Sequence, residues 1–422
     1  MTQAFRLLLL ILLSFSFLYA QDLDGEIRQY EQELKQIEER KENLGLKLES
    51  LKLKRIQRDL RNLGNPVLYA GEELIEHAAF SLVYDEQHEQ AKWVAHILLP
   101  DVIKGNVPRS NDFREDPKVK TGTAEEKDYF LKYPQEDGSF KYDGFGYDRG
   151  HLAPSADFRW SGTALSESYY YSNMSPQVAE LNRGTWAELE SMLRGYMYRH
   201  SNTQLYIVSG PVLNDKLPKI ERSINGVSIP KFYFKVVLDL NNQRGIAFLI
   251  PNKEIKHPIE TMAVSIDQIE KITGLNFFAN LPGNLENVIE GQTAVKDWLA
   301  DAQQDDILPL QAEKLPPHHF NTLTARNFAE FDSHSRVNIC GTVVSTKLTS
   351  KGHIFLNLDK KFPKQIFTAA IWKDNRVNFS YEPHLELEGK CICVEGTVRM
   401  SRGTPTMELK GEENVKFYRE NY

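Results

Sequence analysis

The stretch that decides the fold lies between residues 147 and 190 and contains YDRGHLAPSADF (147–158), YYYSNMSPQ (169–177) and LNRGTWAELE (181–190). A short strand is predicted before His151, and a second strand before a helix that begins near Pro176. Within that helix Asn182, Trp186 and Glu190 recur every four residues, which places them along one side. The order strand, strand, helix therefore brings a histidine, an asparagine and a glutamate into one small region.

These residue types suit the hydrolysis of a phosphodiester. The imidazole of His151 has the pKa best placed to accept a proton from water near pH 7. The oxygen of Asn182 is a hard, neutral ligand for Mg²⁺, and Glu190 can accept hydrogen bonds from metal-bound waters. Arg149 can neutralise charge that develops on the phosphate. Each residue alone is commonly structural, since asparagines often cap helices, but together they predict a one-metal site that cuts nucleic acid.

The same residues carry a resemblance to a known family. Asp148–His151 reads DRGH and resembles the signature of the DNA/RNA non-specific endonuclease family. A second set of residues resembles the family's second motif: Asn173, Gln177, Asn182, Trp186 and Glu190. In this set the glutamate follows Asn182 by eight residues, which is the family's usual spacing. The resemblance covers roughly residues 68–282, where YIVSGP, KFYFKVV and VSIDQIEKITGLNFF are similar to family strands and a late helix.

The resemblance implies a ββα-metal fold, a bound Mg²⁺ or another divalent ion such as Mn²⁺, and hydrolysis of DNA and RNA to products with 5′-phosphates. Carried onto this chain, it makes His151 the general base and Asn182 the direct metal ligand. Glu190 then orients the metal-bound waters, and Asn173 supports the site. Because the contacts centre on phosphate, weak sequence selectivity is expected.

The family also has an arginine upstream of DRGH that contacts phosphate, before a Phe or Trp and a DP-like pair. In this chain Arg109 and Arg114 both flank Phe113, within the polar segment VPRSNDFREDPKV (107–119). The length of this loop does not decide between them. Arg109 is the preferred candidate.

The first twenty residues predict an export signal. Arg6 precedes an apolar run from Leu7 to Leu18, and Ala20 is a suitable cleavage point. A transmembrane anchor is the alternative, but the run is shorter than the roughly 20 residues that a spanning helix needs. Residues 1–20 are therefore predicted to be a signal peptide. The mature protein is expected to be periplasmic or secreted, with no integral membrane span after cleavage.

Residues 21–65 predict a long helix with coiled-coil character. The segment has almost no helix breakers, and apolar residues alternate at spacings of three and four before the pattern slips, at Ile27, Tyr30, Leu34, Ile37, Leu44, Leu48 and Leu51. Such a helix can pair between two chains, as a stalk or a homodimer, or can fold back on its own domain as a solvated helix. Gly64, Asn65 and Pro66 predict its end.

The length of the chain and its secondary-structure patterns predict more than one domain after the N-terminal helix. Its 422 residues exceed what one hydrophobic core normally covers. Because the formal net charge is -7, contacts with nucleic acid must come from local basic patches. Residues 66–287 mix helical and strand patterns and predict an α+β nuclease domain with a mixed sheet core. A polar, proline-containing linker is expected at 288–319.

Residues 320–422 predict an all-β barrel that resembles an OB-fold. Five strand-like runs are expected, at 335–346, 353–358, 365–372, 390–400 and 406–410. Lysines interleave here with four aromatic residues, Phe355, Phe362, Phe367 and Trp372. This pattern is typical of binding to single-stranded nucleic acid, with lysines along the phosphates and rings stacked on bases. The alternative is that the rings fill the barrel core and the lysines are solvated surface.

All three cysteines, Cys340, Cys391 and Cys393, fall in this last unit. In an OB barrel the first and fourth strands are neighbours, so Cys340 can bridge to Cys391 or to Cys393 after export. One thiol is then left over. A zinc site is not expected, because no nearby histidine pattern completes a tetrahedral ligand set.

Three functions are compatible with these features. The intact set His151, Asn182 and Glu190 favours an exported, metal-dependent, sugar-nonspecific endonuclease that acts on DNA and RNA. The alternative is a non-catalytic envelope protein that binds nucleic acid through a degenerate nuclease fold. A metal phosphodiesterase for small nucleotides is disfavoured, because the barrel suits a polymer.

Overall fold

The computed structural model describes residues 2–103, 105, 107–200, 202–298, 306–331, 334–349, 351–401 and 403–418. The chain divides into two compact units, Met1–Arg55 and Ile56–Tyr422. The second unit contains separate sheets and helices, in agreement with the predicted α+β class. In the described part of the chain, no helix combines the length and the apolarity that crossing a membrane requires.

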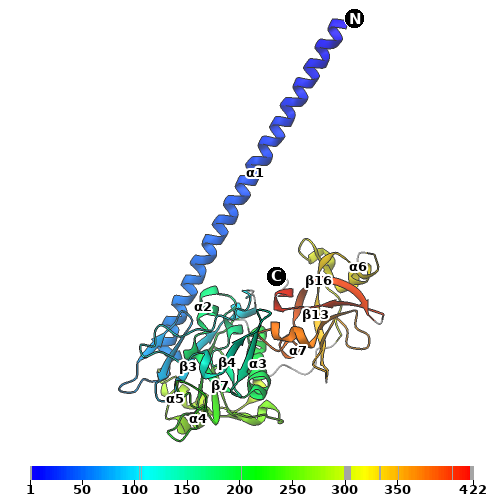
Figure 1. Cartoon of the computed structure of the whole chain (residues 1–422). Coiled ribbons are helices and arrows are strands. Elements are labelled where there is room, and N and C mark those ends of the chain that lie inside the picture. The colour runs from blue at the N-terminus through cyan, green and yellow to red at the C-terminus, as the bar shows by residue number, and fades with distance from the viewer. Residues whose placement is uncertain are drawn as a thin grey trace. The chain divides into compact units, whose positions relative to one another are not determined.

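The N-terminal segment is one continuous helix, α1 (Thr2–Asp59), drawn in blue in Figure 1. A π-turn at Leu60–Gly64 continues it, and Asn65 leaves the helix with extended backbone. The predicted helix is thus confirmed, and it ends at the expected Gly-Asn-Pro break. The apolar row from Ile27 to Leu51 is exposed. Pairing of this row between two chains therefore stays a prediction.

The part of the chain that follows α1 is built on a seven-stranded sheet with the order β1-β2-β3-β8-β9-β10-β11. These strands are β1 (Leu74–Glu76), β2 (Phe80–Asp85), β3 (Gln90–Leu98), β8 (Leu205–Pro211), β9 (Phe232–Asp239), β10 (Arg244–Pro251) and β11 (Ala263–Val264). Every pairing in the sheet is antiparallel, so the prediction of a mixed sheet is wrong. The reason is local: successive strands such as β9 and β10 are joined by short turns, which only antiparallel neighbours allow.

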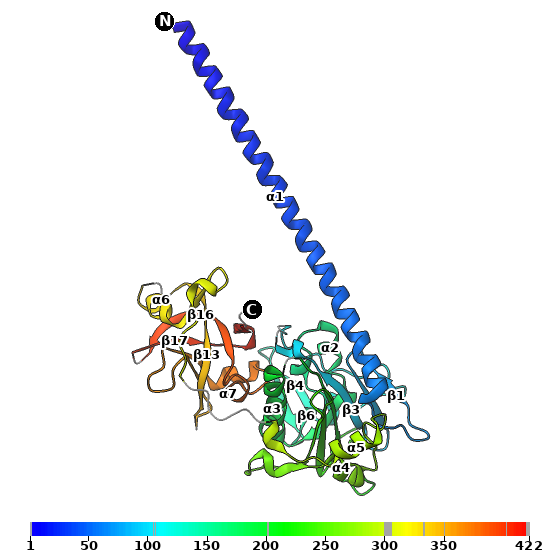
Figure 2. The same cartoon turned by 180° about the vertical axis from the view of Figure 1, so that it is seen from behind.

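A second, smaller sheet leads into a helix. β6 (Asp148–His151), labelled beside that helix in Figure 2, pairs antiparallel with β7 (Met174–Gln177). In this pairing His151 lies opposite Met174. The chain then passes through the π-turn Leu181–Thr185 into α3 (Trp186–Arg199). The predicted order of strand, strand and helix is therefore present. Gly150 is required in β6, since a Cβ there would lie 2.3 Å from Gln177 Oε1.

Three short helices and a hairpin complete this domain: α2 (Gly162–Glu167), α4 (Ile266–Thr273), α5 (Gly283–Glu290), β4 (Phe130–Pro134) and β5 (Phe140–Gly144). The hydroxyl of Ser265 caps α4 by accepting the Gln268 N–H, and Gly274 ends the helix with a φ of 74°. A helix is thus present within VSIDQIEKITGLNFF, where the family resemblance places a late helix. Both α4 and α5 pack on β10, where a Cβ on Gly245 would lie 2.6 Å from Ile289.

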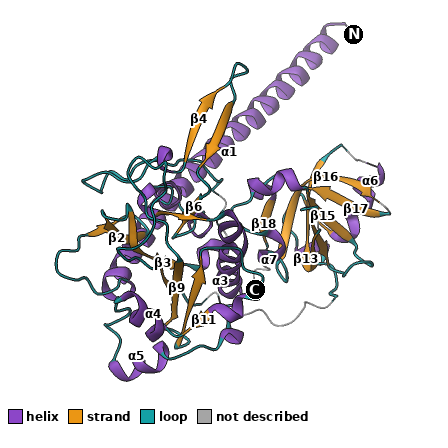
Figure 3. Cartoon of the chain, turned by 60° about the horizontal axis from the view of Figure 1, so that its bottom comes forward, coloured by secondary structure: helices purple, strands orange, loops and turns teal. Residues whose placement is uncertain are grey.

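The chain from His319 onward forms a second seven-stranded sheet with two short helices (Figure 3). Its strand order is β12-β13-β14-β15-β17-β16-β18, and an additional β13–β16 pairing closes five of the strands into a ring. The elements are β12 (His319–Asn321), α6 (Ala325–Phe331), β13 (Arg336–Leu348), β14 (Ile354–Leu358), β15 (Phe367–Ile371), α7 (Pro383–Glu386), β16 (Cys391–Ser401), β17 (Thr404–Glu408) and β18 (Val415–Phe417). The five predicted runs correspond to β13 through β17, with their ends shifted by a few residues.

The aromatic residues that interleave with lysines in this part of the sequence differ in how far they are buried. Phe367 is buried in the apolar core, as the core alternative predicts. In contrast, Phe362 is 73% exposed and Trp372 is 40% exposed. A disulfide joins Cys340 to Cys393, which face each other across β13 and β16. Of the two predicted pairings this is the one that forms, and Cys391 lies outside it.

Candidate active site

His151 ends β6 among aromatic rings. Its ring centroid lies 5.7 Å from that of Phe113 and 5.2 Å from that of Tyr169. Trp186 Nε1 donates a hydrogen bond to the His151 carbonyl oxygen at 3.2 Å, which ties α3 to the strand. His151 Nε2 is buried and has no hydrogen-bond partner among the described residues. The described part of the chain therefore leaves one imidazole nitrogen unused.

Charge around His151 favours its neutral form. Burial, followed by the positive charges of Arg109 and Arg149, lowers the pKa of His151 to about 3. The imidazole is therefore neutral at pH 7 and keeps one unprotonated nitrogen, which is the form that accepts a proton. The same two guanidinium groups concentrate positive charge where a phosphate would have to approach the base.

The two arginines that lower the pKa of His151 differ in how firmly their side chains are fixed by neighbouring residues. Arg109 is exposed, and its Nη1 donates to the Val377 carbonyl oxygen at 3.4 Å, a long hydrogen bond. Arg149 is half-buried: its guanidinium carbon lies 3.6 Å from the centroid of the Phe113 ring, and its Nη1 donates to Tyr171 Oη at 3.2 Å. Arg109 is thus the less constrained of the two.

Arg114, the other upstream candidate, is engaged in the structure of its own loop. Its Nη1 donates to the Asp112 carbonyl oxygen at 2.8 Å, to Asp112 Oδ2 at 2.6 Å and to the Ser166 carbonyl oxygen at 2.9 Å. Its guanidinium also stacks on the Tyr170 ring at 4.2 Å. These contacts give Arg114 a structural task, whereas Arg109 is placed within electrostatic range of the base.

Asn173 holds the chain that follows His151. The side chain is fully buried, and its Oδ1 accepts the Ala153 N–H at 2.9 Å. Its Nδ2 donates to the carbonyl oxygens of Ala153 and Ser168, both at 2.8 Å. Because Ala153 is two residues beyond the histidine, Asn173 fixes the backbone on the far side of the base. This contact pattern is that of a positioning residue.

Asn182 lies in the π-turn before α3, with its amide oriented by a neighbour in β6. Its Nδ2 donates to Asp148 Oδ2 at 2.9 Å. Asp148 is itself fixed by Arg183, whose Nε and Nη2 donate to it at 2.8 and 2.7 Å. With Nδ2 bonded to Asp148, Asn182 Oδ1 remains as the acceptor of the amide. A neutral, oriented amide oxygen fits the preference of Mg²⁺ or Mn²⁺ for oxygen ligands.

Glu190 is half-buried on α3 among charged side chains. Burial raises the pKa of Glu190 to about 7, against the opposing positive charges of Lys235 and Arg194. Arg194 Nη1 lies 4.0 Å from Glu190 Oε2 and donates to Asp157 Oδ1 at 2.9 Å. Lys235 is 1% exposed, donates to Ser209 Oγ at 2.7 Å, and has its pKa lowered to about 8 by burial. The charge of Glu190 is therefore sensitive to its neighbours near neutral pH.

Comparison with known proteins decides the family. The family model described as DNA/RNA non-specific endonuclease matches residues 59–284, more than half of the 422-residue chain. The chain belongs to the DNA/RNA non-specific endonuclease family. It is a hydrolase of the nuclease class, in a family that depends on a divalent metal ion.

Individual relatives of this endonuclease family match the same part of the chain. Mitochondrial endonuclease G of Bos taurus is 31% identical over 240 residues, which cover 52% of this chain and 74% of that protein. A nuclease of a Nostoc species is 33% identical over 226 residues, which cover 50% of this chain and 76% of that protein. A crystal structure of the EndoG/EndoGI complex has a TM-score of 0.44 at 25% identity and covers 54% of this chain and 94% of that chain.

Two residues that contact or act on the predicted site residues were not predicted from the sequence, Asp148 and Lys235. Sequence reasoning missed Asp148 as the residue that orients Asn182, although Asp148 opens the DRGH motif, because 34 residues separate the two. It also missed Lys235, whose buried ammonium acts on Glu190. A single cation inside the apolar strand run FYFKVV (232–237) was the signal that could have revealed Lys235.

Proposed function

We propose that this endonuclease is exported, hydrolyses phosphodiester bonds in both DNA and RNA, and leaves 5′-phosphate ends. The observation that carries the proposal is the neutral His151, with one buried nitrogen that no described residue engages, beside the charges of Arg109 and Arg149. A base, positive charge for phosphate, and the amide oxygen of Asn182 are the parts that metal-assisted phosphodiester hydrolysis requires.

In the proposed mechanism His151 accepts a proton from the water that attacks phosphorus. Its lowered pKa keeps the base form populated at neutral pH. Arg109 stabilises negative charge on the phosphate oxygens in the transition state, and Asn173 keeps the backbone after the base in position. Asn182 would hold Mg²⁺ or Mn²⁺, which supplies positive charge for the developing oxyanion and for the leaving 3′-oxygen. Glu190 accepts hydrogen bonds from waters at that site.

Digestion of plasmid DNA and of RNA, each with and without EDTA, tests this proposal against the binding-only alternative. The endonuclease proposal predicts that both polymers are cut with Mg²⁺ or Mn²⁺, that neither is cut with EDTA, and that the new ends carry 5′-phosphates. The non-catalytic envelope protein predicts retarded but intact nucleic acid under all of these conditions.

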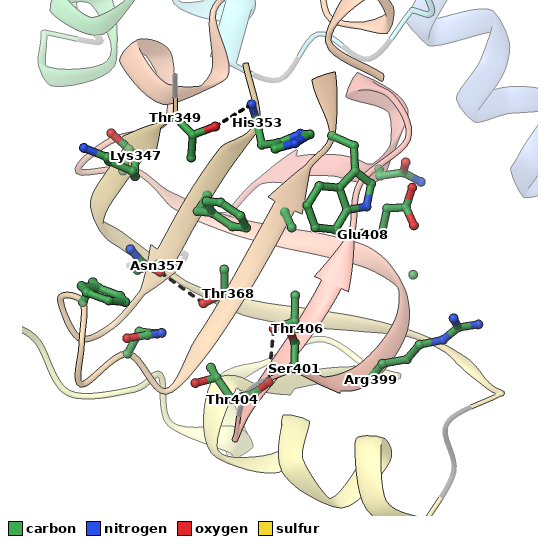
Figure 4. A pocket seen from close by; sticks show the side chains of 18 of the residues that line it. Lys347, Thr349, His353, Asn357, Thr368, Arg399, Ser401, Thr404, Thr406 and Glu408 are labelled. Atoms are coloured by element: carbon green, nitrogen blue, oxygen red, sulfur yellow. Dashed lines mark hydrogen bonds between the residues drawn. The ribbon is translucent and has the colours of Figure 1, made fainter. Parts of the chain in front are cut away.

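We further propose that the second domain is an OB-fold that binds single-stranded nucleic acid in a groove on its barrel (Figure 4). The groove has a volume of about 1610 Å³. Along the barrel strands, side chains that line the groove alternate with side chains that face the core. On β14, Phe355 and Asn357 line the groove, while Leu356, which lies between these two in the sequence, is buried. Thr368 on β15 and Thr406 on β17 also line the groove. The groove is thus a continuous face of the sheet.

The chemistry of this groove suits bases and phosphates together. Trp372 stands edge-on to His353 and Phe355, with ring centroids 5.1 and 6.0 Å apart. Exposed rings of this kind offer stacking surfaces to any base. Six basic side chains line the groove against three acidic ones, and four of the basic ones are Lys347, Lys351, Lys361 and Arg399. This local excess of positive charge matches a polyanion, although the whole chain has a net charge of -7.

Fluorescence anisotropy with a labelled oligothymidylate tests the groove, using full-length His151→Ala protein so that the probe is not cut. Replacing Trp372 and Phe362 by alanine should weaken binding by about tenfold or more, since stacking contributes about 1–3 kcal/mol per base. The matched control is Phe331→Ala, because Phe331 is 85% exposed but lies outside the groove. Equal affinity of the double variant and the control would refute the groove proposal.

We also propose that residues 1–20 direct export and that the mature protein is periplasmic or secreted. The Cys340–Cys393 disulfide supports this location, because disulfides persist mainly in oxidising compartments. Fractionation of expressing cells, with N-terminal sequencing of the product, tests it. A mature protein that begins near Gln21 outside the cytoplasm is expected, and an intact N-terminus in the cytoplasm would contradict the proposal.

A further inference from the structure

Three carboxylates converge where α4 meets α5, two helices that lie side by side in Figures 1 and 2. Asp267 and Glu270 are one turn apart on α4, and Glu290 ends α5. One oxygen of each side chain lies within 4.8 Å of the others. Asp267 is exposed, Glu270 is half-buried and Glu290 is 4% exposed, so the cluster runs from solvent into the domain.

The buried member of this cluster, Glu290, has one carboxyl oxygen without a hydrogen-bond donor among the described residues, and its charged neighbours are all acidic. Glu290 Oε1 is buried and has no hydrogen-bond partner among the described residues. Glu270 offers it none, because a carboxylate only accepts, and Glu270 Oε1 itself accepts the Phe277 N–H at 2.7 Å. After burial, the negative charges of Glu270, Glu286 and Asp267 raise the pKa of Glu290 to about 8. The three neighbouring groups that shift this pKa are therefore all negatively charged, as Glu290 itself is when ionised.

We propose that Asp267, Glu270 and Glu290 form a binding site for a divalent cation, Ca²⁺, that joins α5 to α4. Ionisation of this buried carboxyl without a partner is costly, and a bound cation would supply both the missing partner and the positive charge that stabilises the ionised form. Oxygen-only ligands select hard ions such as Ca²⁺ and Mg²⁺. Ca²⁺ takes about six to eight oxygens in flexible geometry, whereas Mg²⁺ demands a near-ideal octahedron and keeps several waters. Three carboxylates contributed by two separate helices therefore favour Ca²⁺.

The position of the cluster predicts a structural effect. Both helices rest on β10, where Gly245 lies close to Ile289 of α5 and Ile266 of α4. An ion on Glu290 would close α5 onto this support. The family match ends at residue 284, so Glu290 is supplied by chain outside the matched region. The site also shares no residue with the catalytic set around His151, and the proposal does not rest on the proposed function.

The test measures Ca²⁺ binding and thermal unfolding of the full-length protein after removal of metal with EDTA. We expect CaCl₂ to raise the unfolding midpoint to a plateau and calorimetry to detect this binding. Glu290→Gln and Asp267→Asn should each weaken Ca²⁺ binding by at least about tenfold, because ligand charge sets the affinity of such sites. Asn182→Ala, which removes the proposed catalytic ligand, should leave the Ca²⁺ response unchanged.

Two controls keep the proposal open to refutation. Glu221→Gln removes an exposed carboxylate elsewhere and should bind Ca²⁺ like the unmodified protein. If Glu290→Gln does not fold, the exposed Asp267→Asn still gives a result. A midpoint that does not change with CaCl₂ would overturn the proposal, as would unchanged Ca²⁺ affinity in a folded Asp267→Asn or Glu290→Gln variant.

Discussion

Replacement of Arg109 by alanine separates catalytic from structural arginines in this endonuclease. Arg109 is exposed and makes one long hydrogen bond, to the Val377 carbonyl oxygen, so its loss should leave the unfolding midpoint nearly unchanged. Its proposed task is to stabilise charge on the phosphate in the transition state. Removal of one such donor typically costs about 2.7–4 kcal/mol, or about 10²–10³ in kcat.

Arg114→Ala is the matched comparison and should show the opposite pattern. Its guanidinium donates to Asp112 and Ser166 and stacks on Tyr170. After a discount for partial exposure, these contacts contribute about 2 kcal/mol to the free energy of unfolding. Arg114→Ala should therefore lower stability, while folded protein at low temperature keeps most of its activity.

The pH profile gives Arg109→Ala a further signature. The charge of Arg109 lowers the pKa of His151, so its removal should raise that pKa and move the acidic limb of kcat/KM to higher pH. Initial rates on a fluorescent oligonucleotide between about pH 2 and pH 9, a range that includes the pKa of His151, together with urea unfolding, measure both effects. The reasoning is refuted if Arg109→Ala keeps full activity with an unchanged acidic limb, or if Arg114→Ala loses activity without losing stability.

Three further predictions concern the surroundings of the site. Asn173→Ala removes three buried hydrogen bonds and should cost about 2–4 kcal/mol in urea unfolding; a loss below about 0.5 kcal/mol would contradict its positioning role. Lys235→Met removes a positive charge that lowers the pKa of Glu190, so activity at pH 7 should fall and recover at higher pH; a rate profile parallel to that of the unmodified protein would exclude this coupling. Deletion of residues 21–63 should halve the mass measured by light scattering if α1 pairs between chains, whereas a monomer both with and without the helix would disprove the predicted homodimer.

Sequence alone predicted the elements of the site because they are local. The DRGH strand, the SNMSPQ strand and the helix carrying Glu190 are each set by short-range patterns, and each occurs in the structure. What escaped prediction depends on distant partners. Lys235 lies 45 residues beyond Glu190 in the chain, and only the packing of β9 brings its charge to α3. No local pattern contains that information.

Side-chain direction explains the other differences. From the sequence, the four rings of the second domain could either stack on bases or fill the barrel core. In the structure Phe367 on β15 faces the core, whereas Phe355 on β14 lines the groove. Because strand residues alternate between faces, a shift of one residue in the predicted strand reverses this assignment. Likewise Cys391 and Cys393 are two residues apart and share a face, and the register that places Cys393 opposite Cys340 decides the disulfide.

The most direct test of the central claim is cleavage of plasmid DNA and RNA by His151→Ala and Asn182→Ala proteins, with Asn241→Ala as an exposed asparagine control. With Mg²⁺ or Mn²⁺, the two site variants should lose at least about 10³-fold in rate while retaining the unfolding midpoint of the unmodified protein. The control should cut both polymers normally. Full activity of folded His151→Ala protein would contradict the assignment of this histidine as the base.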